Sequence, residues 1–126
     1  MRPTSRLRHS QHHAFPFVVQ NASAARYAYV ANTVLQRNNI AVTDVRWMVP
    51  HQANANLLAQ VARGLKFPTA EGGVISVLED YGNTSSASMG IALDTLRRSG
   101  RIQSGDRLLL PAFGAGFTWG AGLCVA

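Results

Sequence analysis

Residues 45–65 read VRWMVPHQANANLLAQVARGL and place a short apolar run directly before a segment with helical periodicity. The run from Val45 to Val49 is stopped by Pro50, a pattern that is typical of a buried strand. The segment after it carries apolar residues at helical spacing, namely Leu57, Leu58, Val61, Ala62 and Leu65. The stretch therefore predicts a strand that leads into a helix.

The same unit of strand and helix is predicted a second time, further along the chain. Val74 to Leu78 reads as a strand, and a turn at Tyr81-Gly82-Asn83 leads into a helix through Ile91, Leu93 and Leu96. Before residue 45, a helix from Asn21 is predicted, and Asn38-Asn39 closes it. Its expected buried face consists of Ala24, Tyr27, Ala28, Ala31, Val34 and Leu35.

The end of the chain predicts a β-hairpin. Leu108 to Ala112 and Phe117 to Val125 read as strands, joined by the glycine-rich Phe113 to Gly116. Strands that alternate with helices of this length predict an α/β fold, in which helices flank a largely buried sheet. Residues 21–126 form one domain in this interpretation. Residues 1–20 are rich in Arg, Ser, His and Pro without periodicity, and are predicted to be a poorly ordered basic lead-in.

Composition narrows the classes of function. No apolar run approaches the roughly 20 residues that a membrane-spanning helix needs, and no secretory cleavage site is recognisable, so we expect a cytoplasmic protein without a membrane segment. A net charge of +6 favours acidic partners. No aromatic residues interleave the basic clusters as a nucleic-acid surface would need, whereas a small acidic protein or a phosphorylated cofactor fits. With one cysteine and no Cys pair at zinc spacing, no metal site is predicted.

Two polar residues follow predicted strands and precede predicted helices. These are His51 and Asn83. Ligands of open α/β sheets bind beyond the carboxyl ends of strands, so the two side chains are candidates for one shared site. The alternatives are that Asn83 is a turn or cap residue, that His51 is an ordinary loop histidine, and that Asn54 simply caps the helix beside it.

Three segments carry a more specific signal: VPHQAN at residues 49–54, YGNTSSAS at 81–88 and FGAGFTWG at 113–120. In order and spacing they resemble signature blocks of the β-ketoacyl-acyl carrier protein synthase III family, which are thiolase-like condensing enzymes. The resemblance runs from about Asn21 to the C-terminus and covers only the later part of such an enzyme. It implies a layered thiolase-like half that is incomplete relative to full-length members.

The resemblance also implies roles for individual residues. Members of the family transfer an acyl group from acyl-CoA to a cysteine and condense it, with loss of carbon dioxide, with malonyl-acyl carrier protein in fatty acid or polyketide synthesis. His51 and Asn83 match the family's histidine and asparagine, which would hold the thioester oxygen as it gains charge. The amide of Ala115 would belong to an oxyanion hole, and Phe113 would line or gate the acyl pocket. No further cofactor is implied.

A docking surface for acyl carrier protein or CoA is implied on the predicted helix that follows His51. The resemblance assigns it to Gln52, Ala53, Asn54, Ala55 and Asn56, together with Arg63. Asn56 stands where arginine is common, and Gly64 where a second basic residue is common, which weakens the expected surface. Lys66 partly compensates in this interpretation.

The family's cysteine nucleophile is missing from this chain. Cys124 lies within the last predicted strand, and we interpret it as a buried structural cysteine. The preferred hypothesis is a piece of a synthase III that acts with a cysteine-bearing N-terminal half, in a family whose full-length members are homodimers. The alternatives are a non-catalytic partner or remnant that binds carrier protein or a synthase, and, ranked last, a thiol hydrolase that uses Cys124 with His51 and Asn83.

Overall fold

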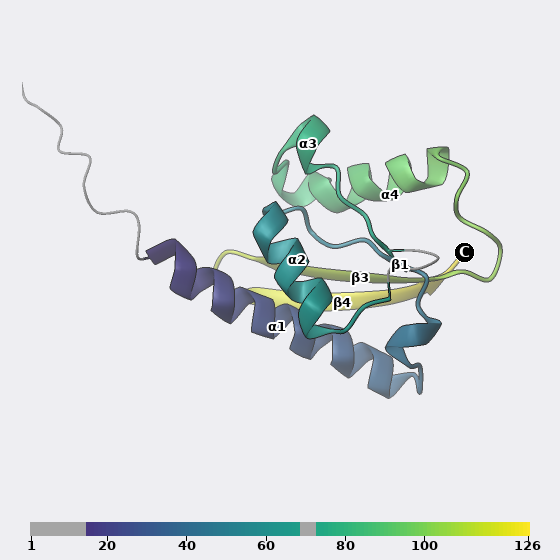
Figure 1. Ribbon diagram of the computed structural model, residues 1–126, viewed down its shortest axis with the longest axis horizontal. Helices are drawn as coiled ribbons and strands as arrows, with labels where there is room; N and C mark the ends of the chain where they lie inside the picture. The colour runs from purple at the N-terminus through teal and green to yellow at the C-terminus, as the bar shows by residue number, and fades with distance from the viewer. Residues whose placement is uncertain (1–14, 69–72) are drawn as a thin grey trace, which may run out of the picture.

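A computed structural model describes the backbone of residues 15–68 and 73–126, with side chains from residue 22 onward. Helices and strands alternate along the chain and build one mixed sheet with helices on both faces (Figure 1). Short 3₁₀ turns lie at Val42–Asp44 and Ser85–Ala87. The remaining elements are α1 (Phe15–Arg37), β1 (Trp47–Met48), α2 (Ala55–Gly64), β2 (Gly73–Val74), α3 (Leu78–Tyr81), α4 (Ser88–Arg98), β3 (Arg107–Gly114) and β4 (Thr118–Val125).

The sheet has the strand order β2-β1-β3-β4. Strands β2, β1 and β3 are parallel, so their carboxyl ends meet at one edge of the sheet, whereas β4 returns antiparallel to β3. The ladder continues beyond β1, because the amide of Val49 donates to the carbonyl of Leu109 and the amide of His51 donates to the carbonyl of Pro111. The parallel edge therefore delivers the residues after β1 to a fixed position beside β3.

Two apolar clusters cover the two faces of the sheet. On one face, α1 and α2 pack over Met48 and Leu109. On the other, Ala92 and Leu96 of α4 pack over Trp47, Val49 and Leu108. Adjacent strand residues point to opposite faces, which explains why Trp47 and Met48 belong to different clusters. The predicted α/β fold with a sheet flanked by helices is thus confirmed.

The first two helices confirm their sequence signals, with one shift. Asn54 caps α2, because its side chain accepts a hydrogen bond from the amide of Leu57 at 2.9 Å. Helix α1 ends before Asn39, which has a φ of 53°, but it begins at Phe15, before the predicted start at Asn21. Pro16 is compatible with this earlier start, because the first turn of a helix does not need its amide donors. The part of the expected lead-in at residues 1–14 lies outside the described residues.

The second strand is shorter than predicted. β2 ends at Val74, and Leu78 begins α3 instead of ending a strand. The reason is the side chain of Gln52, which lies 25 residues earlier and accepts the amide of Val77 at 2.9 Å. Since this amide is bonded to a side chain, it is not available to continue a ladder.

The prediction that Cys124 is buried was wrong, because its side chain is exposed. β4 is an edge strand, and α1 packs over its Leu123 side. Cys124 is paired with Leu108 and points to the opposite face of the sheet, where the described chain does not cover it. No helix among the described residues is long and apolar enough to cross a membrane.

Candidate active site

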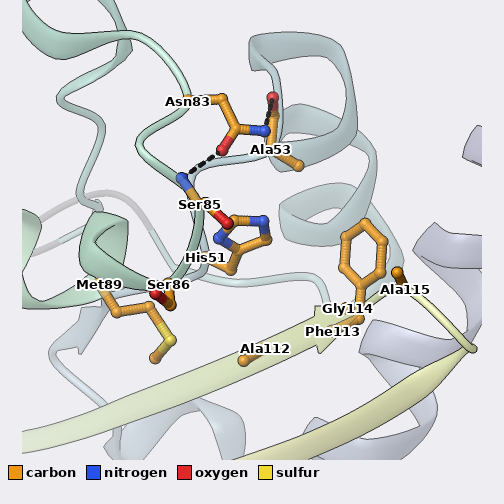
Figure 2. A pocket seen from close by; sticks show the side chains of 10 residues that line it. All are labelled: His51, Ala53, Asn83, Ser85, Ser86, Met89, Ala112, Phe113, Gly114 and Ala115. Atoms are coloured by element: carbon orange, nitrogen blue, oxygen red, sulfur yellow. Dashed lines mark hydrogen bonds between the residues drawn. The ribbon is translucent and has the colours of Figure 1, made fainter.

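A pocket of about 760 Å³ opens at the carboxyl edge of the parallel strands (Figure 2). Its walls come from the loop after β1, the loop before α4 and the end of β3. The side chains of His51 and Asn83 both line this pocket, as do Phe113 and Ala115. The remaining lining residues are Ala53, Ser85, Ser86, Met89, Ala112 and Gly114. His51 and Asn83 thus line one pocket.

The position of His51 is fixed from several directions. Its amide donates to the carbonyl of Pro111 at 3.0 Å, and its own carbonyl accepts the hydroxyl of Tyr27 at 3.1 Å. The imidazole meets the ring of Phe113 edge to face, with centroids 5.7 Å apart. Nδ1 lies 2.6 Å from the hydroxyl of Ser88. The ring is thus held at Nδ1, and Nε2 has no hydrogen-bond partner within residues 15–68 and 73–126.

Burial lowers the pKa of His51 below its ordinary value of 6.5, because desolvation disfavours the imidazolium. The pocket lining holds no other titratable side chain. His51 is therefore expected to be a neutral hydrogen-bond donor at neutral pH.

This shift makes the stability of the chain depend on pH. Below pH 6.5 the unfolded chain takes up the proton before the folded chain does, so the free energy of unfolding should fall as the pH falls through this range. His51→Gln should remove that component. Urea denaturation of both proteins above and below pH 6.5 tests the difference, and an NMR titration midpoint of His51 at or above 6.5 would contradict it.

Asn83 is held by its own loop. Its side-chain oxygen accepts the amide of Ser85 at 2.8 Å, and its Nδ2 donates to the carbonyl of Ala53 at 3.4 Å. The turn interpretation is therefore correct, but it does not exclude a functional one. Because an amide nitrogen has two donor hydrogens, one remains for a ligand after the bond to Ala53. The turn fixes the orientation in which that donor is presented.

Ala115 lies in the turn between β3 and β4. Gly116 and Phe117 take positive φ values of 83° and 42°, whereas Ala115 does not have a positive φ. An alanine at this position is therefore not strained, and the residue belongs to the wall of the pocket. Behind it, the ring of Phe113 packs edge to face on Tyr27 at 5.1 Å. Phe113 forms an apolar wall between α1 and His51.

The residues assigned to docking divide into two groups. Gln52 has no exposed surface, so its side chain lies out of reach of a carrier protein, contrary to the prediction. Its side-chain nitrogen instead donates to the carbonyls of Pro50 and Ile75, and its side-chain oxygen accepts the backbone amide of Val77. Of the others, Ala53 lines the pocket, Asn54 caps α2, and Ala55, Asn56 and Arg63 are exposed.

Sequence reasoning missed the residues that hold the site together. Tyr27 was assigned only to a buried helix face, and Ser88 and Met89 were given no role. The signal for Ser88 lay in the segment YGNTSSAS, where a serine directly precedes the apolar residues of the helix. Its contact with His51 spans 37 residues of sequence, which local patterns do not report.

The geometry also decides against a hydrolase built on Cys124. Cys124 is not among the residues that line the pocket, and the amide of His51 bonds the carbonyl of Pro111, which pairs with Ala121 of β4. Cys124 lies three positions, about 10 Å, further along β4 than Ala121, and β4 is two strand spacings, about 10 Å, from the strand that leads into His51. This thiol is therefore too distant to act with His51.

Comparison with known proteins agrees with this architecture. The family model described as 3-oxoacyl-[acyl-carrier-protein (ACP)] synthase III C terminal matches residues 35–125, which is most of the chain. The chain belongs to this family. The β-ketoacyl-[acyl-carrier-protein] synthase III of Haemophilus ducreyi is 46% identical over 101 residues, which are 80% of this chain and 31% of the relative.

Solved structures of the family superpose on most of the chain. The 3-oxoacyl-(acyl carrier protein) synthase III of Pseudomonas aeruginosa PAO1 has a TM-score of 0.81 at 34% identity, covering 87% of this chain and 33% of that one. The priming β-ketosynthase from the R1128 polyketide pathway gives the same TM-score, identity and coverage. The fold is thus the thiolase-like fold of the synthase III family. The chain spans about a third of the length of the relatives that it matches.

Proposed function

We propose that this chain supplies the decarboxylation side of a β-ketoacyl-acyl carrier protein synthase III active site. The observation that carries the proposal is the pocket in which His51 and Asn83 lie together with the glycine-rich turn of Ala115. A second, cysteine-bearing part would supply the nucleophile and the remaining wall. In this division, acyl-CoA loads the cysteine and malonyl-acyl carrier protein enters the pocket formed here.

The proposed decarboxylation depends on hydrogen-bond donors to the thioester oxygen more than on a general base. When carbon dioxide leaves a malonyl thioester, the electrons of the broken carbon–carbon bond move onto the thioester oxygen as an enolate. Two donors aimed at that oxygen stabilise the enolate more than the ground state, and so lower the barrier. A neutral imidazole N–H and an amide N–H suit this purpose, because neither repels the developing charge.

The second step joins the two substrates. The enolate carbon attacks the carbonyl of the acyl-cysteine, the carbon–sulfur bond breaks, and the cysteine leaves as a thiolate. The amide of Ala115 is proposed to donate to the carbonyl oxygen during this attack, since the glycine-rich turn lets a backbone N–H approach closely. Phe113 would bound the acyl chain. A reducing cytoplasm would keep the cysteine available as a thiol.

We propose the exposed face of α2 as the place where the carrier protein docks. Asn56 and Arg63 are seven residues apart, which is close to two helical turns, and both are exposed. Arg63 carries the only formal charge of this pair, and its positive charge suits an acidic carrier protein. Charge pairing at such a rim mainly speeds encounter.

Arg63→Glu is therefore expected to slow association with carrier protein about tenfold at low salt, with a smaller difference at high salt. Surface plasmon resonance at two salt concentrations measures this effect. Arg97→Glu is the matched control, because Arg97 is also exposed but lies at the far end of α4. Equal slowing by both substitutions would show that the overall charge of the chain matters and that docking on α2 does not.

The proposed function is tested with a chimera. Residues 21–126 replace the corresponding C-terminal third of the Haemophilus ducreyi relative, which supplies the cysteine-bearing part. We expect the chimera to decarboxylate malonyl-acyl carrier protein and to condense it with an acyl-CoA, and we expect the isolated chain to do neither. A folded chimera that binds carrier protein without decarboxylation would instead support the alternative, a non-catalytic partner or remnant.

A further inference from the structure

Ser88 connects the two loops that form the pocket. It is the first residue of α4, and its side chain has no exposed surface. Its hydroxyl oxygen lies 2.6 Å from Nδ1 of His51 and accepts the amide of Gln52 at 3.1 Å. Within the described part of the chain, these are the hydrogen bonds of this hydroxyl.

The two bonds together limit the direction of the hydroxyl proton. A serine hydroxyl has one donor hydrogen and two acceptor lone pairs, and the amide of Gln52 occupies one lone pair. If Nδ1 carried a proton and donated it to Ser88, the buried hydroxyl hydrogen would have no acceptor. If Nδ1 carries no proton, the hydroxyl donates to it and every group is satisfied. A buried polar group left without a partner is unfavourable, so the second arrangement is preferred.

We propose that Ser88 is a positioning residue, which holds His51 in the tautomer that has its proton on Nε2. Nε2 has no hydrogen-bond partner among the residues that the structure describes, so its N–H is available to a ligand in the pocket. The role in catalysis rests on the proposed function, whereas the tautomer does not depend on it. The opposite tautomer would present a lone pair to the thioester oxygen and would repel it.

The bond to Gln52 gives Ser88 a second part in the same arrangement. It links the first residue of α4 to the backbone directly after His51, so one oxygen atom fixes the position of α4 relative to the loop that carries His51. Gln52 in turn bonds the carbonyl of Ile75 and the amide of Val77. The ring of His51 is therefore oriented by a buried network and not by the open side of the pocket.

The tautomer is measured directly by nitrogen-15 NMR of the imidazole in the full chain and in the chimera. The His51 signals are assigned by their absence from His51→Gln, since the chain has 4 histidines. We expect the proton on Nε2 in the unmodified protein, and a proton on Nδ1 would overturn the proposal without any variant. In Ser88→Ala the ratio of the Nε2–H to the Nδ1–H form should fall about fivefold, the effect of one net hydrogen bond.

Two further variants separate positioning from packing. Ser88→Thr keeps a hydroxyl and should restore the Nε2–H form. Ser99→Ala makes the same chemical change at the other end of α4, where the hydroxyl donates to the carbonyl of Leu96 at 2.6 Å, and should leave the tautomer unchanged. An unchanged tautomer in Ser88→Ala, or an equal change in Ser99→Ala, would overturn the proposal.

Activity in the chimera distinguishes this proposal from the proposed function. If both hold, Ser88→Ala should lower kcat of malonyl-acyl carrier protein decarboxylation in proportion to the lost Nε2–H form, with little change in KM. If Ser88→Ala shifts the tautomer of His51 in a chimera that does not decarboxylate, the role of Ser88 would stand and the proposed function would be contradicted. If the chimera decarboxylates but Ser88→Ala leaves the tautomer of His51 unchanged, the proposed function would stand and the role of Ser88 would be contradicted.

Discussion

Asn83→Ala is expected to lower the rate of malonyl-acyl carrier protein decarboxylation by about 10²–10³ in the chimera. This is the usual effect of removing one donor to a developing oxyanion. His51→Ala should have an effect of the same order, because both side chains line the pocket and each is proposed to supply one donor. The double variant should lose less than the product of the two single effects, since donors to one oxygen act as a unit.

The control for this prediction is Asn38→Ala. Asn38 is exposed at the end of α1 and donates to the carbonyl of Val34 at 2.8 Å, so this variant makes the same chemical change away from the pocket. Rates are measured as release of carbon dioxide, and binding of carrier protein is measured separately. If Asn83→Ala changed KM alone, Asn83 would bind substrate and transition state equally, and the proposed role as an oxyanion donor would be contradicted.

Gln52→Met is expected to destabilise the isolated chain by about 3 kcal/mol or more. Methionine keeps the length and unbranched shape of glutamine but leaves three buried backbone groups without partners, at roughly 1–3 kcal/mol each. These groups are the carbonyls of Pro50 and Ile75 and the amide of Val77. Urea denaturation measures the change in the free energy of unfolding.

Gln36→Met is the matched control for this substitution, because Gln36 is exposed on α1. Its free energy of unfolding should change by less than about 0.5 kcal/mol, as is usual for a surface site. A loss below about 1 kcal/mol for Gln52→Met would mean that the three backbone groups find other partners. Gln52 would then not be the residue that ends β2 and positions α3.

Local patterns were enough to predict most of the fold. The strand before Pro50, the helix capped by Asn54 and the hairpin around Gly114 each depend on residues that are neighbours in sequence. The shared pocket of His51 and Asn83 was expected because the carboxyl ends of parallel strands meet at one edge, although α3 lies between β2 and Asn83. The resemblance of three sequence segments to the synthase III family indicated which reaction the site would serve.

The features that the sequence did not reveal all depend on distant contacts. β2 stops where it does because Gln52 bonds Val77, 25 residues away. Ser88 reaches His51 across 37 residues. The exposure of Cys124 depends on which face of the edge strand β4 is covered by a helix. The apolar residues next to Cys124 in the sequence do not reveal which face that is.

The most direct test is a crystal structure of the chimera with a malonyl thioester analogue that does not lose carbon dioxide. The prediction is that Nε2 of His51 and Nδ2 of Asn83 both lie about 2.7–3.2 Å from the thioester oxygen. An oxygen bound by one of the two alone, or by neither, would contradict the shared role proposed for this pocket.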